Sequence, residues 1–330
     1  MNTRRILVGV GVTATTLLVA GYGIASVVVY NRLTKIGACP AAWATNVPNA
    51  FGVLAADGTP NPGREDFDAA PYLMPEPEDV MIPSRDAGIE LSGWYVPAVA
   101  AGAPVVVIAH GLSACRRDAT VLVPAGMLHR NGFAVLLVDL REHGDSTIED
   151  GHYAGGTEEY RDLLGVWDWL QADRGFAPER IGLAGISLGA ATSLIATGHE
   201  PLVAAVWADS SFADLPAFIR DELSRQGYPT FLDIGAVLAG RIIRGDDLAA
   251  DSPLRNVRRL AGRPIYITHG ERDDVVKVAD GRALAAAVEA DGGVAGTWFV
   301  PGSGHTRAMI DQPDEYERRL VGFFREALGG

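Results

Sequence analysis

Short, uninterrupted apolar runs recur along this chain, and segments with helical spacing separate them. The runs are PVVVIA, FAVLLVD, RIGLAGI, LVAAVWAD, PIYITHG and TWFVPG, and they begin at residues 104, 133, 180, 202, 264 and 297. Apolar runs of this length predict strands that are buried on both faces of a sheet. Helices between such strands predict a parallel sheet that right-handed crossovers wind with helices on both sides. We therefore expect an α/β fold with a mostly parallel, doubly covered sheet.

Two stretches depart from this rhythm. Residues 79–84 and 89–97 alternate apolar and polar side chains around a short polar turn, which predicts an antiparallel hairpin at the start of the domain. Residues 212–254 form an extra, mostly helical stretch between two strands, and we expect it to lie as a cap over the carboxyl ends of the strands. The apolar cap residues indicate acyl chains as ligands or simply cap packing; they are Phe218, Phe231, Ile234, Val237 and Leu238. The whole domain is expected over residues 78–330.

The N-terminus is a separate unit. Residues 6–30 carry no charge, and they lie between Arg4 and Arg5 on one side and Arg32 and Lys35 on the other. A helix of that length is about 38 Å long, enough to cross a hydrocarbon core of about 30 Å. The alternative is a cleaved signal peptide, but its apolar region is normally shorter and ends in small residues. We expect a single-pass transmembrane anchor over 6–30.

Residues 31–77 are rich in Pro, Gly, Ala and Asn and predict a tether between anchor and domain. The basic residues before the span favour a cytoplasmic N-terminus, which puts the domain on the extracytoplasmic side of the cell membrane. Because the tether separates the two parts, catalysis is expected not to depend on the anchor. A chain that starts near Leu73 should then fold and work alone.

Composition excludes several classes of site. The net charge is −13, and no cluster of Lys and Arg is present that would bind nucleic acid. The two cysteines, Cys39 and Cys115, are too few for a disulfide scaffold and have no metal-ligand spacing. No zinc motif and no phosphate-binding loop occurs in the sequence. We expect no metal and no organic cofactor.

Chemistry in such sheets gathers at the carboxyl ends of the strands. The polar residues that follow the apolar runs are His110, Asp139, Arg141, Ser187, Asp209, His269, Asp273 and His305. Ser187 lies in Gly-Ile-Ser-Leu-Gly, at the change from strand to helix. A sharp turn there exposes the serine hydroxyl, and Gly185 and Gly189 remove side chains that would collide. The Leu188 N–H begins the next helix, where negative charge is favoured.

The stretches IAHGLS, DLREHGDS, GISLG, HGERDDVV and GSGH, at residues 108, 139, 185, 269 and 302, resemble the α/β-hydrolase superfamily over about residues 78–328. Within it they are similar to the branch of serine aminopeptidases and dienelactone hydrolases. The resemblance implies Ser187 as nucleophile, Asp273 as orienting acid and His305 as general base. It also implies an oxyanion hole from the N–H groups of Leu112 and Leu188. The implied activity is a serine hydrolase that cleaves ester, thioester or amide bonds of small-molecule or lipid-like acyl substrates through an acyl-enzyme.

Alternatives remain open at several residues. Asp209 ends a strand where some relatives have their acid, so it competes with Asp273. His110 and His269 are expected to be structural, and His143 is expected in a solvated turn or near the site. A dinucleotide-dependent oxidoreductase would also have a Gly-rich turn followed by an acid, but it needs glycine where Ser187 lies. A non-catalytic, membrane-tethered binding protein on a hydrolase fold is the other alternative.

Overall fold

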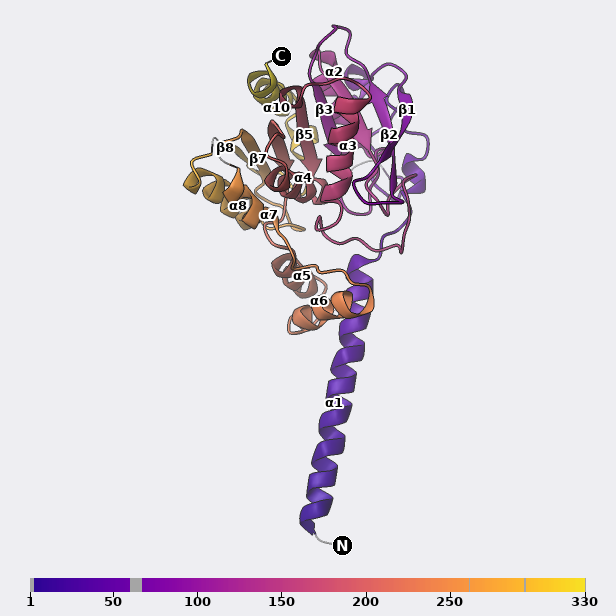
Figure 1. The fold of residues 1–330 in the computed structure, drawn as a ribbon, viewed down its shortest axis with the longest axis vertical. Helices are drawn as coiled ribbons and strands as arrows, with labels where there is room; N and C mark the ends of the chain where they lie inside the picture. Colours follow the sequence, from indigo (N-terminus) through magenta and orange to yellow (C-terminus); the bar gives the residue numbers. More distant parts are fainter. Residues whose placement is uncertain (1–2, 60–66, 261, 294, 330) are drawn as a thin grey trace.

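A rounded α/β domain lies at one end of a long, projecting helix (Figure 1). The computed structural model describes residues 3–59, 67–260, 262–293 and 295–329. The strands are β1 (Glu78–Pro83), β2 (Glu90–Val96), β3 (Val105–Ala109), β4 (Ala134–Val138), β5 (Ile181–Ile186), β6 (Ala205–Asp209), β7 (Ile265–Gly270) and β8 (Ala295–Val300). The helices are α1 (Thr3–Thr34), α2 (Ala119–Arg130), α3 (Tyr160–Ala172), α4 (Leu188–His199), α5 (Leu215–Arg225), α6 (Leu232–Ile243), α7 (Pro253–Asn256), α8 (Val278–Ala290), α9 (Ala308–Asp311) and α10 (Pro313–Leu328).

The eight strands form one sheet in the order β1-β2-β4-β3-β5-β6-β7-β8. β1 and β2 pair as the predicted antiparallel hairpin, with Glu78 opposite Tyr95. β2 is also antiparallel to β4, and the remaining pairs are parallel. The central strands are the continuous apolar runs of the sequence, and β3 to β7 are buried along their whole length. The predicted α/β-hydrolase fold is confirmed.

Helices cover both faces of this sheet. One apolar core joins the sheet to α3, α4 and α8, and it includes Leu163, Leu194 and Leu284. A second core lies on the other face under α2 and α10, where Met127 and Phe324 are buried. Because both faces are covered, polar side chains have access to solvent chiefly at the strand ends, and this limits where a site can form.

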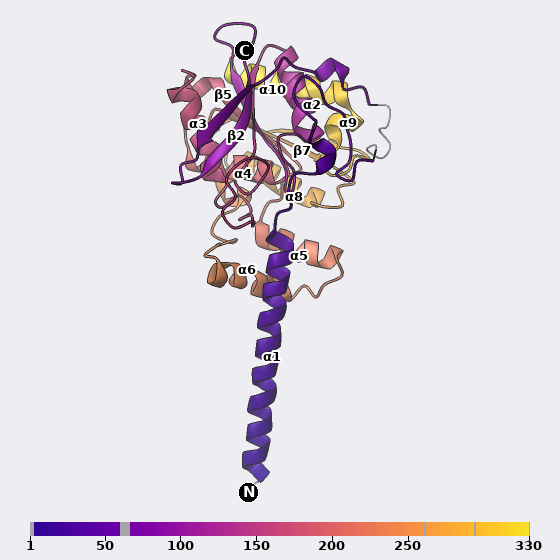
Figure 2. The same cartoon turned by 90° about the vertical axis from the view of Figure 1, so that its right-hand side faces the viewer.

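The predicted cap is present between β6 and α7. It consists of α5 and α6, which pack on each other and lie beside α1 in both views (Figures 1 and 2). The cap lies over the carboxyl end of the sheet, on the side of the domain from which α1 projects.

Helix α1 contains a stretch, Val12–Thr34, that is long and apolar enough to cross a membrane. Its final turns do not stand free, because they pack against the cap. Val29 and Tyr30 are buried, and the Tyr30 hydroxyl donates a hydrogen bond to the Asp246 carboxylate. The Tyr22 hydroxyl donates to the Phe231 carbonyl oxygen at 3.0 Å. Helix and cap are therefore one packed unit at this end of α1.

The described residues between α1 and β1 lie on the domain surface. Trp43 and Tyr72 are buried there. Cys39 forms a disulfide with Cys115, and their Cα atoms are 5.7 Å apart. No role was predicted for these two cysteines from the sequence. A pair separated by 76 residues has no local sequence pattern, so this contact was missed. Residues 60–66 of the predicted tether lie outside the described residues, and its remainder packs on the domain.

Candidate active site

Ser187 lies in a sharp turn between β5 and α4. Its φ is +54°, a left-handed conformation that a serine rarely adopts and that is typical of strained functional turns. A Cβ on Gly185 would collide with the backbone of Gly189, and a Cβ on Gly189 would collide with the Ala109 carbonyl. The two glycines thus permit the close approach of strand and helix that exposes the Ser187 hydroxyl, as the sequence analysis expected of them.

The structure brings Ser187, His305 and Asp273 into one hydrogen-bonded row. His305 Nε2 lies 3.0 Å from Ser187 Oγ, and His305 Nδ1 lies 2.7 Å from Asp273 Oδ2. A carboxylate only accepts hydrogen bonds, so Nδ1 carries the proton and Nε2 is left to accept from the serine hydroxyl. Asp273 follows β7 and His305 follows β8, at the same edge of the sheet as Ser187. This geometry suits a nucleophile, a base and an orienting acid.

Asp273 is held as a carboxylate. Burial by itself would raise its pKa, but hydrogen bonds from His269, His305 and the Val276 N–H hold it well below the ordinary range. The Val275 and Val276 N–H groups donate to Asp273 Oδ1 at 2.9 and 2.8 Å. One oxygen is therefore fixed by the backbone, and the other is available to the histidines.

His269 contacts the acid directly. Its Nε2 lies 3.1 Å from Asp273 Oδ2 and 2.9 Å from the Val276 carbonyl oxygen, so Nε2 donates to both. Burial lowers its pKa, but the hydrogen bond to Asp273 outweighs this and raises it. The sequence analysis expected a structural histidine. The spacing of four residues between His269 and Asp273 was the available indication of this contact.

The competing acid Asp209 lies elsewhere, and Asp274, the residue directly after Asp273, faces solvent. Asp209 is fully buried and accepts hydrogen bonds from Ser210 Oγ and from the Tyr316 hydroxyl, both at 2.9 Å. Burial raises the pKa of Asp209 to about 6. Asp274 is exposed. Of the three carboxyl groups, Asp273 is the one recorded in a hydrogen bond with His305 among the described residues.

Two backbone N–H groups flank Ser187. Within the described part of the chain, neither the Leu112 N–H nor the Leu188 N–H has an intramolecular acceptor. Gly111 brings its loop close, because a Cβ on it would lie 3.3 Å from Ser187 Cβ. Leu112 lines the pocket that contains Ser187, and Leu188 directly follows Ser187 as the first residue of α4. Donors in this position stabilise an oxyanion, and that role stays a prediction for both.

The loop that carries Leu112 is supported by a histidine that the sequence analysis expected in a solvated turn or near the site. His143 is buried, and burial lowers its pKa to about 4. Its neutral ring donates from Nδ1 to the Arg141 carbonyl oxygen at 2.9 Å and accepts at Nε2 from the Ser113 N–H at 3.3 Å. The prediction of a solvated turn is thus wrong, because the loop of residues 139–146 folds back against the loop of residues 111–113.

His110 is structural, as expected. It is completely buried, and burial holds its pKa well below the ordinary value. Its Nδ1 donates to the Gly111 carbonyl oxygen at 2.7 Å, and its Nε2 accepts from the Leu140 N–H at 3.1 Å. Asp139, also buried, forms an ion pair with Arg116 and accepts from its backbone N–H at 2.6 Å. These contacts fix both loops beside Ser187.

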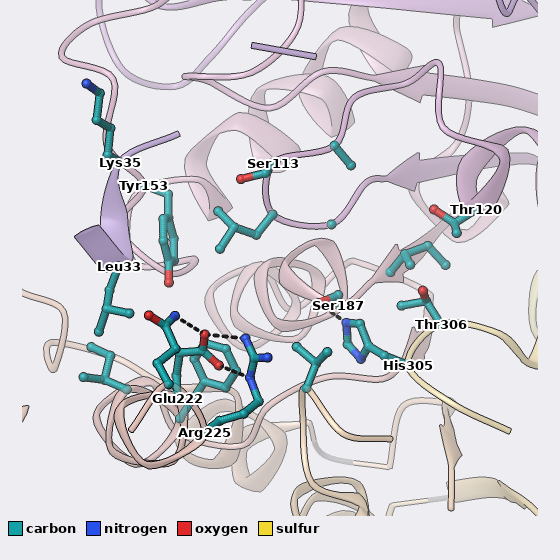
Figure 3. A pocket seen from close by; sticks show the side chains of 18 of the residues that line it. Leu33, Lys35, Ser113, Thr120, Tyr153, Ser187, Glu222, Arg225, His305 and Thr306 are labelled. Carbon is teal, nitrogen blue, oxygen red and sulfur yellow. Dashed lines mark hydrogen bonds and ion pairs between the residues drawn. The ribbon is translucent and has the colours of Figure 1, made fainter. Parts of the chain in front are cut away.

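A pocket of about 370 Å³ opens above Ser187 and His305 (Figure 3). Glu222 and Arg225 of the cap form an ion pair across from the serine. Leu33 of α1 and Lys35, just after its end, form another wall. The expectation that catalysis is independent of the anchor stays a prediction, and the structure shows that the last turn of α1, the helix that contains the candidate span, reaches the pocket. The described lining residues also include Arg32, Leu112, Tyr153, Phe218, Ile219 and Thr306.

Within the described ranges, no group of three or more His, Cys, Asp or Glu side chains is arranged to hold a metal ion. The turn before α4 has a serine side chain where a dinucleotide pyrophosphate would need glycine.

Three known proteins are similar to this chain. Protein ABHD12B of Homo sapiens is 30% identical over 200 residues, which cover 58% of this chain and 51% of that protein. Thiohydrolase aneE of Aspergillus aculeatus is 29% identical over 147 residues, or 41% of this chain and 45% of that enzyme. The chain thus spans about half the length of these curated relatives.

The fold is shared with the Pyrococcus furiosus esterase Pf2001, with a TM-score of 0.64 at 21% identity over 86% of this chain and all of that one. The model of the prolyl oligopeptidase family matches residues 124–330, which is more than half of the chain and includes Ser187, Asp273 and His305. The chain is an α/β hydrolase and belongs to the prolyl oligopeptidase family.

Proposed function

We propose that this protein is a membrane-anchored serine hydrolase that cleaves acyl esters through a covalent acyl-enzyme. The observation that carries the proposal is the row from Ser187 Oγ through His305 to Asp273, with distances of 3.0 and 2.7 Å. Ser187 and His305 line a pocket, and the N–H groups of Leu112 in its wall and of Leu188 next to Ser187 are the candidate oxyanion donors. A decayed, non-catalytic relative would be under no requirement to keep this geometry.

In the first half of the reaction, Ser187 Oγ attacks the acyl carbonyl carbon while His305 Nε2 takes the hydroxyl proton. The carbonyl oxygen becomes an oxyanion, which the Leu112 and Leu188 N–H groups stabilise. Asp273, a carboxylate because its pKa is held low by His269 and His305 despite burial, stabilises the imidazolium. The tetrahedral intermediate then collapses, the bond to the leaving group breaks, and His305 gives it the proton.

In the second half, a water molecule takes the place of the leaving group. His305 Nε2 removes a proton from the water as its oxygen attacks the acyl carbon of the ester on Ser187. The second intermediate collapses, the bond to Ser187 Oγ breaks, and His305 returns the proton to the serine. The carboxylic acid leaves and the free enzyme is restored.

The anchor and its orientation are part of the proposal. The candidate span in α1 supports a single-pass protein. Arg4 and Arg5 before the span favour a cytoplasmic N-terminus. The Cys39–Cys115 disulfide also supports an extracytoplasmic domain, because disulfides persist in oxidising compartments.

The most specific part of the proposal is the class of substrate. Apolar side chains on two walls of the pocket, Leu33 of α1 and Phe218 and Ile219 of the cap, suit an acyl chain. The name of the related thiohydrolase makes a thioester the second candidate. The resemblance to serine aminopeptidases and the family match make aminoacyl amides the third.

A kinetic comparison of two pocket serines tests the proposal. The full-length protein in detergent is assayed on p-nitrophenyl esters of graded chain length, with acyl thioesters and aminoacyl amides alongside. We expect Ser187→Ala to lower kcat by about 10⁴–10⁶. Ser113→Ala is the matched control, because Ser113 lines the same pocket but has no recorded contact with His305. A folded Ser187→Ala protein with normal turnover would overturn the proposal.

A further inference from the structure

The outer surface of α6 carries an apolar stripe that nothing in the domain covers. Ile234 and Ile242 are 68% and 73% exposed. We call four residues the α6 stripe; they are Phe231, Ile234, Leu238 and Ile242, all exposed. Their spacing of three, four and four residues puts them on one side of the helix. Four large apolar side chains in one exposed row are uncommon on a soluble protein surface and indicate a contact site.

The small residues of α6 fix how the stripe lies relative to α1. Gly235 lies against Ser26, and Gly240 lies against Tyr30, so this side of α6 packs on the anchor helix. Tyr22 stacks on Phe231 with ring centroids 6.2 Å apart. The stripe therefore begins beside Tyr22, and α6 lies on the side of the domain from which α1 projects (Figures 1 and 2).

The length of the apolar part of α1 before the cap indicates how deep in a bilayer the α6 stripe would lie. The uncharged run begins at Ile6. Helix α1 is exposed from Val12 to Ile24, with Tyr22 already in contact with Phe231, and after Ile24 it is packed on the cap. Ile6 to Ile24 is nineteen helical residues, about 28 Å at 1.5 Å per residue. A hydrocarbon core is about 30 Å thick. If residues 6–24 of α1 span the bilayer, the helix leaves it near the level of Phe231, the residue before α6.

We propose that the α6 stripe lies in the surface of the same membrane that α1 crosses, and that the pocket receives lipid-like acyl amphiphiles from that surface. The occupant of the stripe is the bilayer. Amphipathic helices with an apolar face of this kind lie in the interface with that face among the acyl chains. The proposal rests on the proposed hydrolase function for its second part alone.

The pocket has walls from α1 and from the cap, the same two units that carry the α6 stripe and its contacts. Leu33 lies one helical turn after Val29 and Tyr30 and lines the pocket. Phe218 and Ile219 of the cap helix α5 line it as well. The membrane helix and the cap thus form both the membrane contact and two walls of the pocket. An acyl chain that leaves the bilayer beside α1 meets apolar side chains on its way to Ser187.

A depth measurement tests the first part without any enzyme assay. Ile234→Cys and Leu238→Cys are each labelled with an environment-sensitive fluorophore in the full-length protein in phosphatidylcholine vesicles. The native cysteines are paired and do not react. We expect a blue-shifted emission that lipids with a quencher on the acyl chain suppress. Glu326→Cys on α10, exposed and remote from α1, is the control and should behave as in water. Water-like emission at both stripe positions would overturn the proposal.

A kinetic measurement tests the second part. The triple variant Ile234→Ser, Leu238→Ser, Ile242→Ser is compared with the wild type on a long-chain acyl ester in vesicles and on a water-soluble acetyl ester. We expect at least a tenfold loss on the vesicle substrate and less than a twofold change on the soluble one, since none of the three lines the pocket.

Val99→Ser with Leu202→Ser, two exposed apolar residues outside α1 and the cap, is the matched control. Equal losses on both substrates, or none on vesicles, would contradict membrane delivery. A wild type inactive on both substrates would instead refute the proposed function.

Discussion

Replacing Cys39 with serine removes the disulfide that joins the segment after α1 to Cys115, close to the loop that contains Leu112. The bond closes a loop of 76 residues, and the chain-entropy estimate for a loop of that length is about 4.5 kcal/mol. Measured values are often smaller, about 2–4 kcal/mol. Cys115 is buried next to Arg116, whose contacts with Asp139 fix the loops at the site. We therefore expect a loss of about 2–4 kcal/mol in the free energy of unfolding, together with a lower kcat.

The assay is urea unfolding of the full-length protein in detergent, followed by tryptophan fluorescence, with and without a reductant. The reductant should lower the unfolding midpoint of the wild type and leave that of Cys39→Ser unchanged, which makes the variant its own control. Identical wild-type midpoints in both conditions, or reaction of the native protein with a thiol reagent, would refute the reasoning.

Three further predictions follow from the site and the packing. Asp273→Asn should lower kcat by about 10⁴, as expected when the orienting acid of a triad is lost, whereas Asp209→Asn should retain most activity; the reverse ranking would make Asp209 the acid. Burial raises the pKa of Asp209 to about 6 from 3.8. The contribution of its protonated carboxyl group to the free energy of unfolding is therefore fully present below pH 4 and is lost as the pH rises through 6. The free energy of unfolding should be lower at pH 7 than at pH 4, and Asp209→Asn should reduce this difference by up to about 3 kcal/mol. An unchanged difference in the variant would contradict the burial argument. A chain that starts at Leu73 lacks the α1 wall of the pocket and the disulfide, so we expect a lower melting temperature and slower ester hydrolysis than for the full chain. Equal rates would show that this wall is dispensable.

Features of the site that depend on local sequence were predictable. Gly185, Ser187 and Gly189 lie within five residues, and the steric demand of the turn is visible in that pattern alone. The apolar runs are the strands, because a strand buried on both faces tolerates few polar residues. The hairpin and the cap followed from the same reasoning.

Features that depend on distant contacts were not predictable. The Cys39–Cys115 pair and the Tyr30–Asp246 hydrogen bond join residues 76 and 216 positions apart, and no local pattern marks them. The burial of His143 depends on how its loop folds under Ser113, which a polar sequence does not reveal. The contact between the end of α1 and the pocket was not predictable for the same reason. The charge-free run predicts a helix, but it does not indicate what the last turns of that helix contact.

Mapping the covalent adduct of a fluorophosphonate probe tests the central claim most directly. The full-length protein in detergent is treated with the probe, digested, and analysed by mass spectrometry. We expect one phosphonyl group per chain on Ser187, no adduct in Ser187→Ala, and labelling of a folded His305→Ala protein that is slower by about 10³-fold or more. A folded wild-type protein that takes no label, or takes it on another serine, would contradict the account.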